Sequence, residues 1–108
     1  MKPLLVSVTT ENVEQARRIA QVLVEERLAA CVQVVPQIHS VYRWKGKAEE
    51  AGESLLLIKS SQELWESLQK RIRELHSYEC PEVVALPVYA AEASYLNWWS
   101  HCLESSQG

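Results

Sequence analysis

A long β-rich segment, residues 31–44, is the feature that most constrains how this chain can fold. As one extended strand it would run about 45 Å. The amphipathic segment before it, about sixteen residues, would form a helix only about 24 Å long. The distal part of a hairpin built on residues 31–44 should therefore project beyond its own helices. It carries the apolar side chains Ile38, Val41, Tyr42 and Trp44.

Such a projecting ribbon needs a partner, because an isolated two-stranded ribbon is marginal in water and an open apolar edge favours pairing with another chain. Ribbons that pack head to tail must close into a ring, and three copies make the smallest such ring. We therefore expect a homotrimer. The alternative is that the ribbon bends at Pro36, which marks a bulge or an unpaired edge, and folds back on its own sheet.

The other strands are short and apolar. Residues 4–9 and 83–88 are rich in strand-forming residues, and residues 54–59 form a continuous apolar run that predicts a strand covered on both faces. Lys45, Gly46 and Lys47 make the turn between the second and third strands.

Two amphipathic helices alternate with these strands. Asn12, with Gln15 three residues later, has the form of a helix N-cap, and apolar residues follow at three- and four-residue steps as far as Leu28. Ser60 with Glu63 repeats the capping pattern for a second helix. The buried stripe predicted for that helix is Leu64, Leu68, Ile72 and Leu75. A short aromatic helix is expected over residues 92–103.

This order predicts an α+β fold, the ferredoxin-like βαββαβ arrangement with a long hairpin between its second and third strands and a C-terminal helix. Right-handed crossovers would place both main helices on one face of an antiparallel sheet. A chain of 108 residues suits one domain with a real core, so we expect a single domain over 1–108 with 104–108 as a flexible tail.

Charge and composition exclude several partners. The net charge is -3 and the eleven Lys and Arg residues are spread along the chain, so no basic stripe predicts nucleic-acid binding. No apolar stretch is long enough for a signal peptide or a membrane span, so we expect a cytoplasmic protein without a membrane partner. The odd number of cysteines, three, suits reduced thiols better than a disulfide framework.

The composition also argues against an enzyme. The chain contains no aspartate, which excludes a Ser-His-Asp triad. Its three glycines stand far apart, which excludes both the dinucleotide-binding and the Walker phosphate loops. A nucleophile pair of Cys80 and His76 remains as an alternative.

Five sequence segments occur in a fixed order along the chain. They are EERLAACV (25–32), SVYRWKGK (40–47), LLLIK (55–59), HSYE (76–79) and YLNW (95–98). Together they resemble the CutA family, the divalent-ion tolerance proteins, over nearly the whole chain. The resemblance implies a ferredoxin-like subunit in a tight homotrimer, similar in architecture to the PII regulatory proteins. It also implies a part in copper or divalent-metal tolerance and no established enzymatic activity.

The sequence departs from the family at three positions. Ser77 stands where the family usually has proline, which predicts a less rigid link after the second helix. Metal positions proposed in parts of the family correspond here to Val8 and Leu75, so that His76 alone remains.

The heptad HSYECPE, residues 76–82, is the densest group of possible metal ligands. An imidazole with a thiolate and a carboxylate suits Cu(II) or another divalent cation, so we take His76 and Glu79, with Cys31 as a further candidate, as weak metal ligands. The alternative is structural: His76 ends a helix, Pro81 makes Cys80 extended, and Cys31 is a small core residue.

The resemblance also places the ribbon of one chain near these motifs, which suggests an inter-subunit cleft. The residues that we expect around it are Tyr42, Trp44, Lys59, Tyr78 and Trp98. In this alternative function the protein is a PII-like sensor that binds a small anionic ligand through Lys59. The competing interpretation is that the aromatic residues simply fill the trimer interface.

Overall fold

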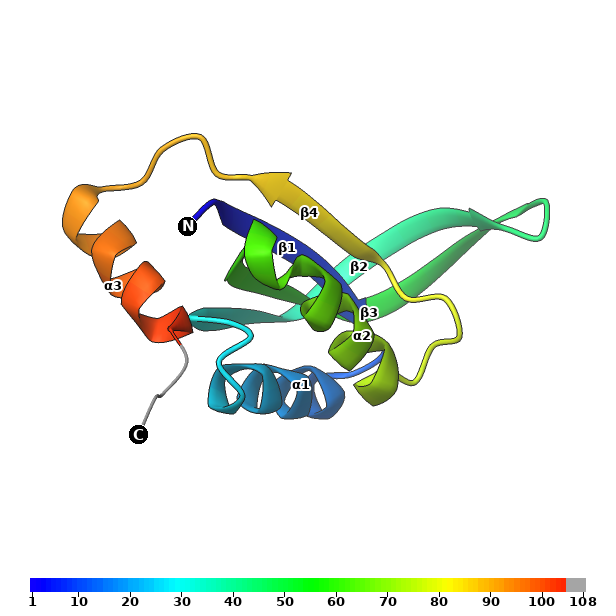
Figure 1. Ribbon diagram of the computed structural model, residues 1–108. Helices are drawn as coiled ribbons and strands as arrows, with labels where there is room; N and C mark the ends of the chain where they lie inside the picture. Colours follow the sequence, from blue (N-terminus) through cyan, green and yellow to red (C-terminus); the bar gives the residue numbers. More distant parts are fainter. Residues whose placement is uncertain (105–108) are drawn as a thin grey trace.

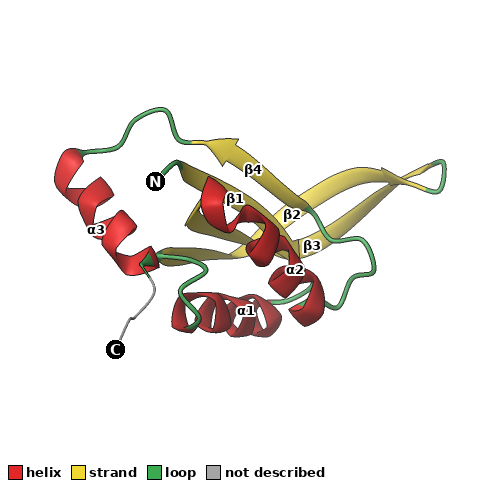
Figure 2. Ribbon diagram, viewed as in Figure 1, coloured by secondary structure: helices red, strands yellow, loops and turns green. Residues whose placement is uncertain are grey.

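The computed structural model describes residues 1–104 and contains a four-stranded sheet with the two main helices packed on one face (Figures 1 and 2). The strand order is β2-β3-β1-β4, and every neighbouring pair is antiparallel, which confirms the ferredoxin-like α+β fold. The predicted flexible tail lies outside the described residues, except for Glu104. The elements are β1 (Pro3–Thr10), α1 (Val13–Glu25), β2 (Cys31–Trp44), β3 (Lys47–Ser61), a 3-10 turn η1 (Gln62–Leu64), α2 (Trp65–Leu75), β4 (Val83–Pro87) and α3 (Ala93–Leu103).

β2 and β3 form a hairpin whose distal half projects past both helices as a twisted two-stranded ribbon (Figure 1). The ladder shifts between Val35 and Ile38, so the bulge predicted at Pro36 is confirmed. The alternative in which the ribbon folds back on its own sheet is wrong. Lys45 and Gly46 have φ of 50° and 81°, as a two-residue type I′ turn requires, and this turn matches the twist of the strands.

β3 is much longer than the apolar run that predicted it, because polar residues on both sides of residues 54–59 also pair with β2 or β1. The pairing extends out to Trp44 opposite Lys47. Cross-strand hydrogen bonding, rather than strand propensity, therefore keeps the polar part of β3 extended.

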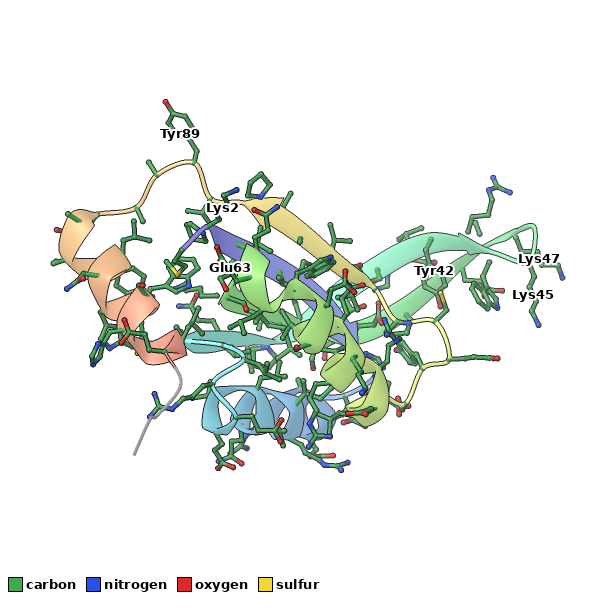
Figure 3. All side chains as sticks on the ribbon, in the orientation of Figure 1. Lys2, Tyr42, Lys45, Lys47, Glu63 and Tyr89 are labelled. Carbon is green, nitrogen blue, oxygen red and sulfur yellow. The ribbon has the colours of Figure 1, made fainter. Side chains whose placement is uncertain are left out.

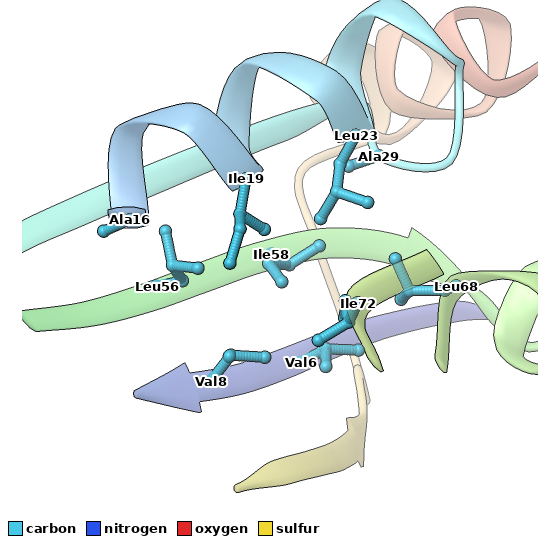
Figure 4. Close-up of a cluster of buried hydrophobic side chains, with 10 residues drawn as sticks. All are labelled: Val6, Val8, Ala16, Ile19, Leu23, Ala29, Leu56, Ile58, Leu68 and Ile72. Carbon is cyan, nitrogen blue, oxygen red and sulfur yellow. The ribbon is translucent and has the colours of Figure 1, made fainter. Parts of the chain in front are cut away.

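The core lies between the sheet and the two helices α1 and α2 (Figure 4). Each fully buried Leu, Ile or Val contributes about 1.5–3 kcal/mol to the free energy of unfolding. The sheet contributes Val6, Val8, Leu56 and Ile58, and the helices contribute Ala16, Ile19, Leu23, Leu68 and Ile72.

The helix ends agree only partly with the predictions. Asn12 caps α1, since its Oδ1 accepts a hydrogen bond from the Gln15 amide at 2.8 Å. The predicted cap at Ser60 is wrong: this residue still belongs to β3, and its buried hydroxyl donates to the Leu28 carbonyl at 2.7 Å.

Among residues 1–104 no helix has the length and apolarity needed to cross a membrane.

The opposite face of the sheet carries apolar side chains that neither α1 nor α2 covers. Because side chains alternate along a strand, the neighbours of the core residues point to this second face. We call it the open face, and it includes Leu5, Leu55, Leu57, Val84 and Leu86. On the edge strand β4, Val84 is 48% and Leu86 is 52% exposed. α3 meets this face near Lys59, whose Nζ contacts Tyr95.

Candidate functional site

A groove of about 930 Å³ lies between the ribbon and the connection that follows α2. We call it the ribbon groove. Figure 3 shows Tyr42 on the ribbon beside this connection, drawn in yellow. Its lining includes three aromatic side chains (Tyr42, Trp44, Tyr78), three carboxylates (Glu53, Glu79, Glu82) and the exposed thiol of Cys80.

His76 fixes the start of that connection. Its ring is buried and bonds at both nitrogens: Nδ1 accepts a hydrogen bond from the Tyr78 amide at 3.0 Å, so Nε2 carries the proton and donates to the Thr9 carbonyl oxygen at 2.7 Å. The imidazole therefore ties the loop to the end of β1. A metal ion could reach either nitrogen only if one of these hydrogen bonds were broken.

The three predicted metal ligands do not meet within one chain. Through the sheet register, Thr9, which holds His76, pairs with Leu55, whereas Cys31 pairs with Lys59. Four residues along β3 separate these levels by about 13 Å. Across residues 1–104 the structure contains no group of three His, Cys, Asp or Glu side chains able to hold a metal ion.

Tyr78 and Glu53 form the polar wall of the groove. The Tyr78 hydroxyl donates to Glu53 Oε2 at 2.9 Å. Burial, strengthened by this carboxylate, raises the pKa of Tyr78 to about 12. The phenol therefore stays protonated at neutral pH and remains a donor to Glu53. Glu82 is also engaged, because its Oε2 accepts from the Ser7 hydroxyl at 2.9 Å.

Within one chain the five residues predicted for a ligand cleft separate into two groups, one beside the ribbon and one beside α3, and these two elements lie at opposite ends of the molecule (Figure 1). Tyr42, Trp44 and Tyr78 line the ribbon groove. Lys59 instead donates its Nζ to the Tyr95 hydroxyl at 2.8 Å and lies 5.1 Å from the centre of that ring.

Trp98 belongs to this second group. Its ring lies 5.3 Å from that of Tyr95, on α3. The cation that was expected to bind an anionic ligand is therefore absent from the lining of the ribbon groove.

Sequence reasoning missed Glu53 and Glu82 as groove residues. Glu53 precedes Tyr78 by 25 positions, and the pairing of β3 with β1 brings it near, because Ser54 lies opposite Thr10 and His76 ties the connection after α2 to Thr9. No local motif marks such a residue. The alternative nucleophile pair also lacks support, since no hydrogen bond joins His76 and Cys80 within the described part of the chain.

Comparison with known proteins gives a consistent result. The family described as CutA1 divalent ion tolerance protein matches residues 4–102. The divalent-cation tolerance protein CutA of Thermus thermophilus is 47% identical over 94 residues, which are 87% of this chain and 91% of that protein. Protein CutA of Mus musculus is 47% identical over 98 residues, 91% of this chain but 55% of the relative.

Solved structures agree with the sequence relatives. CutA1 from Oryza sativa superposes with a TM-score of 0.93 at 39% identity, covering 98% of this chain and 97% of that one. A periplasmic divalent cation tolerance protein CutA from Archaeoglobus fulgidus gives a TM-score of 0.91 at 31% identity, covering 94% and 99%. The chain spans about half the length of the mammalian and chloroplastic curated relatives.

Proposed function

The chain belongs to the CutA1 divalent ion tolerance family, and from this premise we propose that it acts in divalent-metal tolerance or response as a homotrimer. In this proposal the trimer binds metal ions weakly and catalyses no reaction. The observation that carries the proposal is the uncovered apolar surface of the single chain, on the open face and on the ribbon.

The open face and the ribbon support assembly together. Trp44 is 54% and Val41 is 66% exposed on the ribbon, and β4 adds Val84 and Leu86. Exposed apolar side chains gathered on two faces of one chain favour protein–protein interfaces there. The ribbon and the sheet face are different surfaces, so a contact between them is head to tail and must close into a ring.

Light scattering tests the assembly. We expect a mass three times 12.3 kDa, about 37 kDa, that persists at micromolar concentration. Leu86→Glu places a charge on the open face and should produce smaller species. Val24→Glu, at an exposed apolar position on α1, is the matched control and should leave the mass unchanged. A folded monomer of the native chain at micromolar concentration contradicts the proposal.

Metal binding in this proposal requires ligands from more than one chain. Among residues 1–104 a single chain gathers no three side chains able to hold a metal ion. His76, Glu79 and Cys31 remain the proposed ligands of Cu(II) or another divalent cation. Cu(II) titration of the assembled protein should show weaker binding in Glu79→Gln and unchanged binding in Glu66→Gln, a control on α2. Equal affinity in both variants and the native chain counts against these ligands.

The proposed absence of catalysis rests on the lack of aspartate and on the engagement of both His76 nitrogens with backbone groups. A cytoplasmic location is likewise a proposal. It is supported by the three free cysteines, Cys31, Cys80 and Cys102, because unpaired thiols suit a reducing compartment. Fractionation of the producing cells checks it.

The ribbon groove favours a second candidate function, a small-ligand sensor similar in architecture to the PII proteins. A groove of about 930 Å³ is of the size that binds small molecules. A metabolite screen by thermal shift tests this candidate, because a ligand at 100 times its Kd adds about 2.7 kcal/mol to the free energy of unfolding. If no metabolite raises the unfolding temperature, the result argues for metal response, or for a trimer that serves as a scaffold and binds no ligand.

A further inference from the structure

The ribbon leaves the body of the sheet at one residue of β3. Ser54 is the last β3 residue that pairs with β1, opposite Thr10, and from there to the ribbon tip β3 pairs with β2 alone. The register of β2 shifts at the same level, so that Pro36 and Gln37 together face Ser54. We call Pro36, Gln37 and Ser54 the ribbon root. The bulge in β2 and the end of the pairing with β1 therefore coincide there.

A buried hydroxyl fixes the bulge. Proline has no backbone N–H, and a bulge leaves backbone groups out of the ladder. The side chain of Ser54 replaces the missing partner, because its hydroxyl donates to the Pro36 carbonyl oxygen at 2.7 Å. Ser54 is only 1% exposed, and a hydroxyl buried to this degree needs a partner within the protein. The bond therefore holds the two strands together at the root.

The second residue of the bulge has its own counterpart on β3. A Cβ atom on Gly52 would come 2.8 Å from Gln37 Nε2, closer than Cβ atoms approach a neighbouring atom in real proteins. Glycine in a strand commonly marks such a close approach. The missing side chain of Gly52 thus gives Gln37 room to lie across β3. Each bulge residue is matched by a particular residue on the partner strand.

The ribbon root determines where the ribbon tip lies. Seven residues separate Ser54 from Lys47 at the start of β3, a length of about 23 Å at 3.3 Å per residue. A change of about 10° in the bend at the root would move the tip by about 4 Å. The exposed apolar side chains of Val41 and Trp44 move with the ribbon. Close-packed side chains do not tolerate a displacement of this size.

We propose that Ser54 is a positioning residue for assembly. Its hydrogen bond to Pro36 holds the ribbon at the angle at which Val41 and Trp44 meet the neighbouring copy. This inference rests on the proposed homotrimer, and it adds the residue on which the direction of the ribbon depends. Neither metal binding nor a small ligand is needed for it.

Ser60 provides a matched control on the same strand. Its hydroxyl is also buried and also donates to a backbone carbonyl, that of Leu28, at 2.7 Å. Ser60 lies at the end of β3 away from the ribbon. Ser54→Ala and Ser60→Ala therefore remove the same kind of hydrogen bond, and both should lower stability against denaturant by similar amounts. Only Ser54→Ala releases the ribbon root.

Subunit exchange measures the effect on assembly. The full chain is prepared with ordinary and with heavy nitrogen, the two forms are mixed, and native mass spectrometry follows the trimers of mixed mass. One subdenaturing concentration of guanidinium chloride lets even a tight ring dissociate during the assay. We expect Ser54→Ala to exchange about tenfold faster than Ser60→Ala, because a chain that leaves a ring of three breaks two contacts, each weakened by the loss of one hydrogen bond.

Ser54→Cys is the conservative variant. It keeps the shape of the side chain but only a weak donor, so its exchange rate should lie between those of the native chain and Ser54→Ala. The same comparison with Ser60→Ala holds for Ser54→Cys if the alanine variant does not fold.

The other outcomes overturn the inference in distinguishable ways. Equal exchange rates in Ser54→Ala and Ser60→Ala, or a faster rate in Ser60→Ala, mean that the Ser54 hydroxyl contributes only to the stability of the chain. The homotrimer stands in that case. If light scattering shows that the native chain is a folded monomer, the proposed assembly fails and the inference fails with it.

Discussion

Replacing His76 should destabilise the protein even when no metal is present. In His76→Ala, the Thr9 carbonyl loses its donor and the Tyr78 amide loses its acceptor. Thr9 is buried, and a buried polar group left without a partner costs about 1–3 kcal/mol. With two such groups, one of them only partly buried, we expect the free energy of unfolding to fall by about 3 kcal/mol.

Two conservative variants separate the two hydrogen bonds. The side-chain oxygen of Asn can occupy the position of Nδ1, so His76→Asn should keep the bond to Tyr78. The longer amide of Gln can reach the position of Nε2, so His76→Gln should keep the bond to Thr9. Each variant should recover about 1 kcal/mol relative to His76→Ala.

Guanidinium chloride unfolding in the presence of a metal chelator measures these values. All proteins must be compared at one chain concentration, because the stability of an oligomer depends on concentration. A loss below about 0.5 kcal/mol in His76→Ala would refute the structural role. If the loss appeared only when Cu(II) was present, His76 would act mainly as a metal ligand.

Three further changes test other parts of the fold. Lys45→Asn should stabilise the ribbon by about 0.5 kcal/mol, because asparagine tolerates positive φ and favours a type I′ turn before glycine; chemical denaturation at one chain concentration measures this. Ser60→Ala should cost about 1–3 kcal/mol in the same assay, since it leaves the Leu28 carbonyl without its donor; an unchanged midpoint contradicts it. The pKa of Tyr78 is about 12 when folded and about 10 when unfolded, so its stabilising contribution is complete below pH 10 and is lost as the pH rises towards 12. The full shift corresponds to about 2.7 kcal/mol, which solvent access reduces to about 1 kcal/mol; the native chain should lose this amount over that pH range relative to Tyr78→Phe, and parallel pH profiles would contradict the assignment.

The element order was predictable because it depends on local periodicity. Apolar residues at helical spacing predicted α1 and α2, and the cap at Asn12 was correct because its hydrogen bond spans only three residues. Prediction was less accurate where a residue pairs with a distant part of the chain. Ser60 has the form of a cap, yet its hydroxyl bonds to Leu28, which is 32 residues away.

The candidate site was predictable only in part. The sequence identified Tyr42, Trp44 and Tyr78, because these aromatic residues stand in the predicted ribbon or directly after the predicted second helix. Residue type and position along the chain are enough to mark them. It also grouped Lys59 with them as part of a cleft between subunits; within one chain Lys59 bonds to Tyr95 on α3, away from the ribbon, so this grouping stays a prediction about the assembly. It also missed Glu53, which joins the groove through strand register.

The sequence by itself determined the α+β order, the projecting ribbon and the family, because each depends on residue type and spacing along the chain. Tertiary structure alone decided the charge of the groove and the state of His76. A carboxylate or an imidazole acquires its role from the groups placed around it, and strand pairing brings those groups from distant positions. For His76 the decisive partner is the carbonyl of Thr9, 67 residues earlier in the chain.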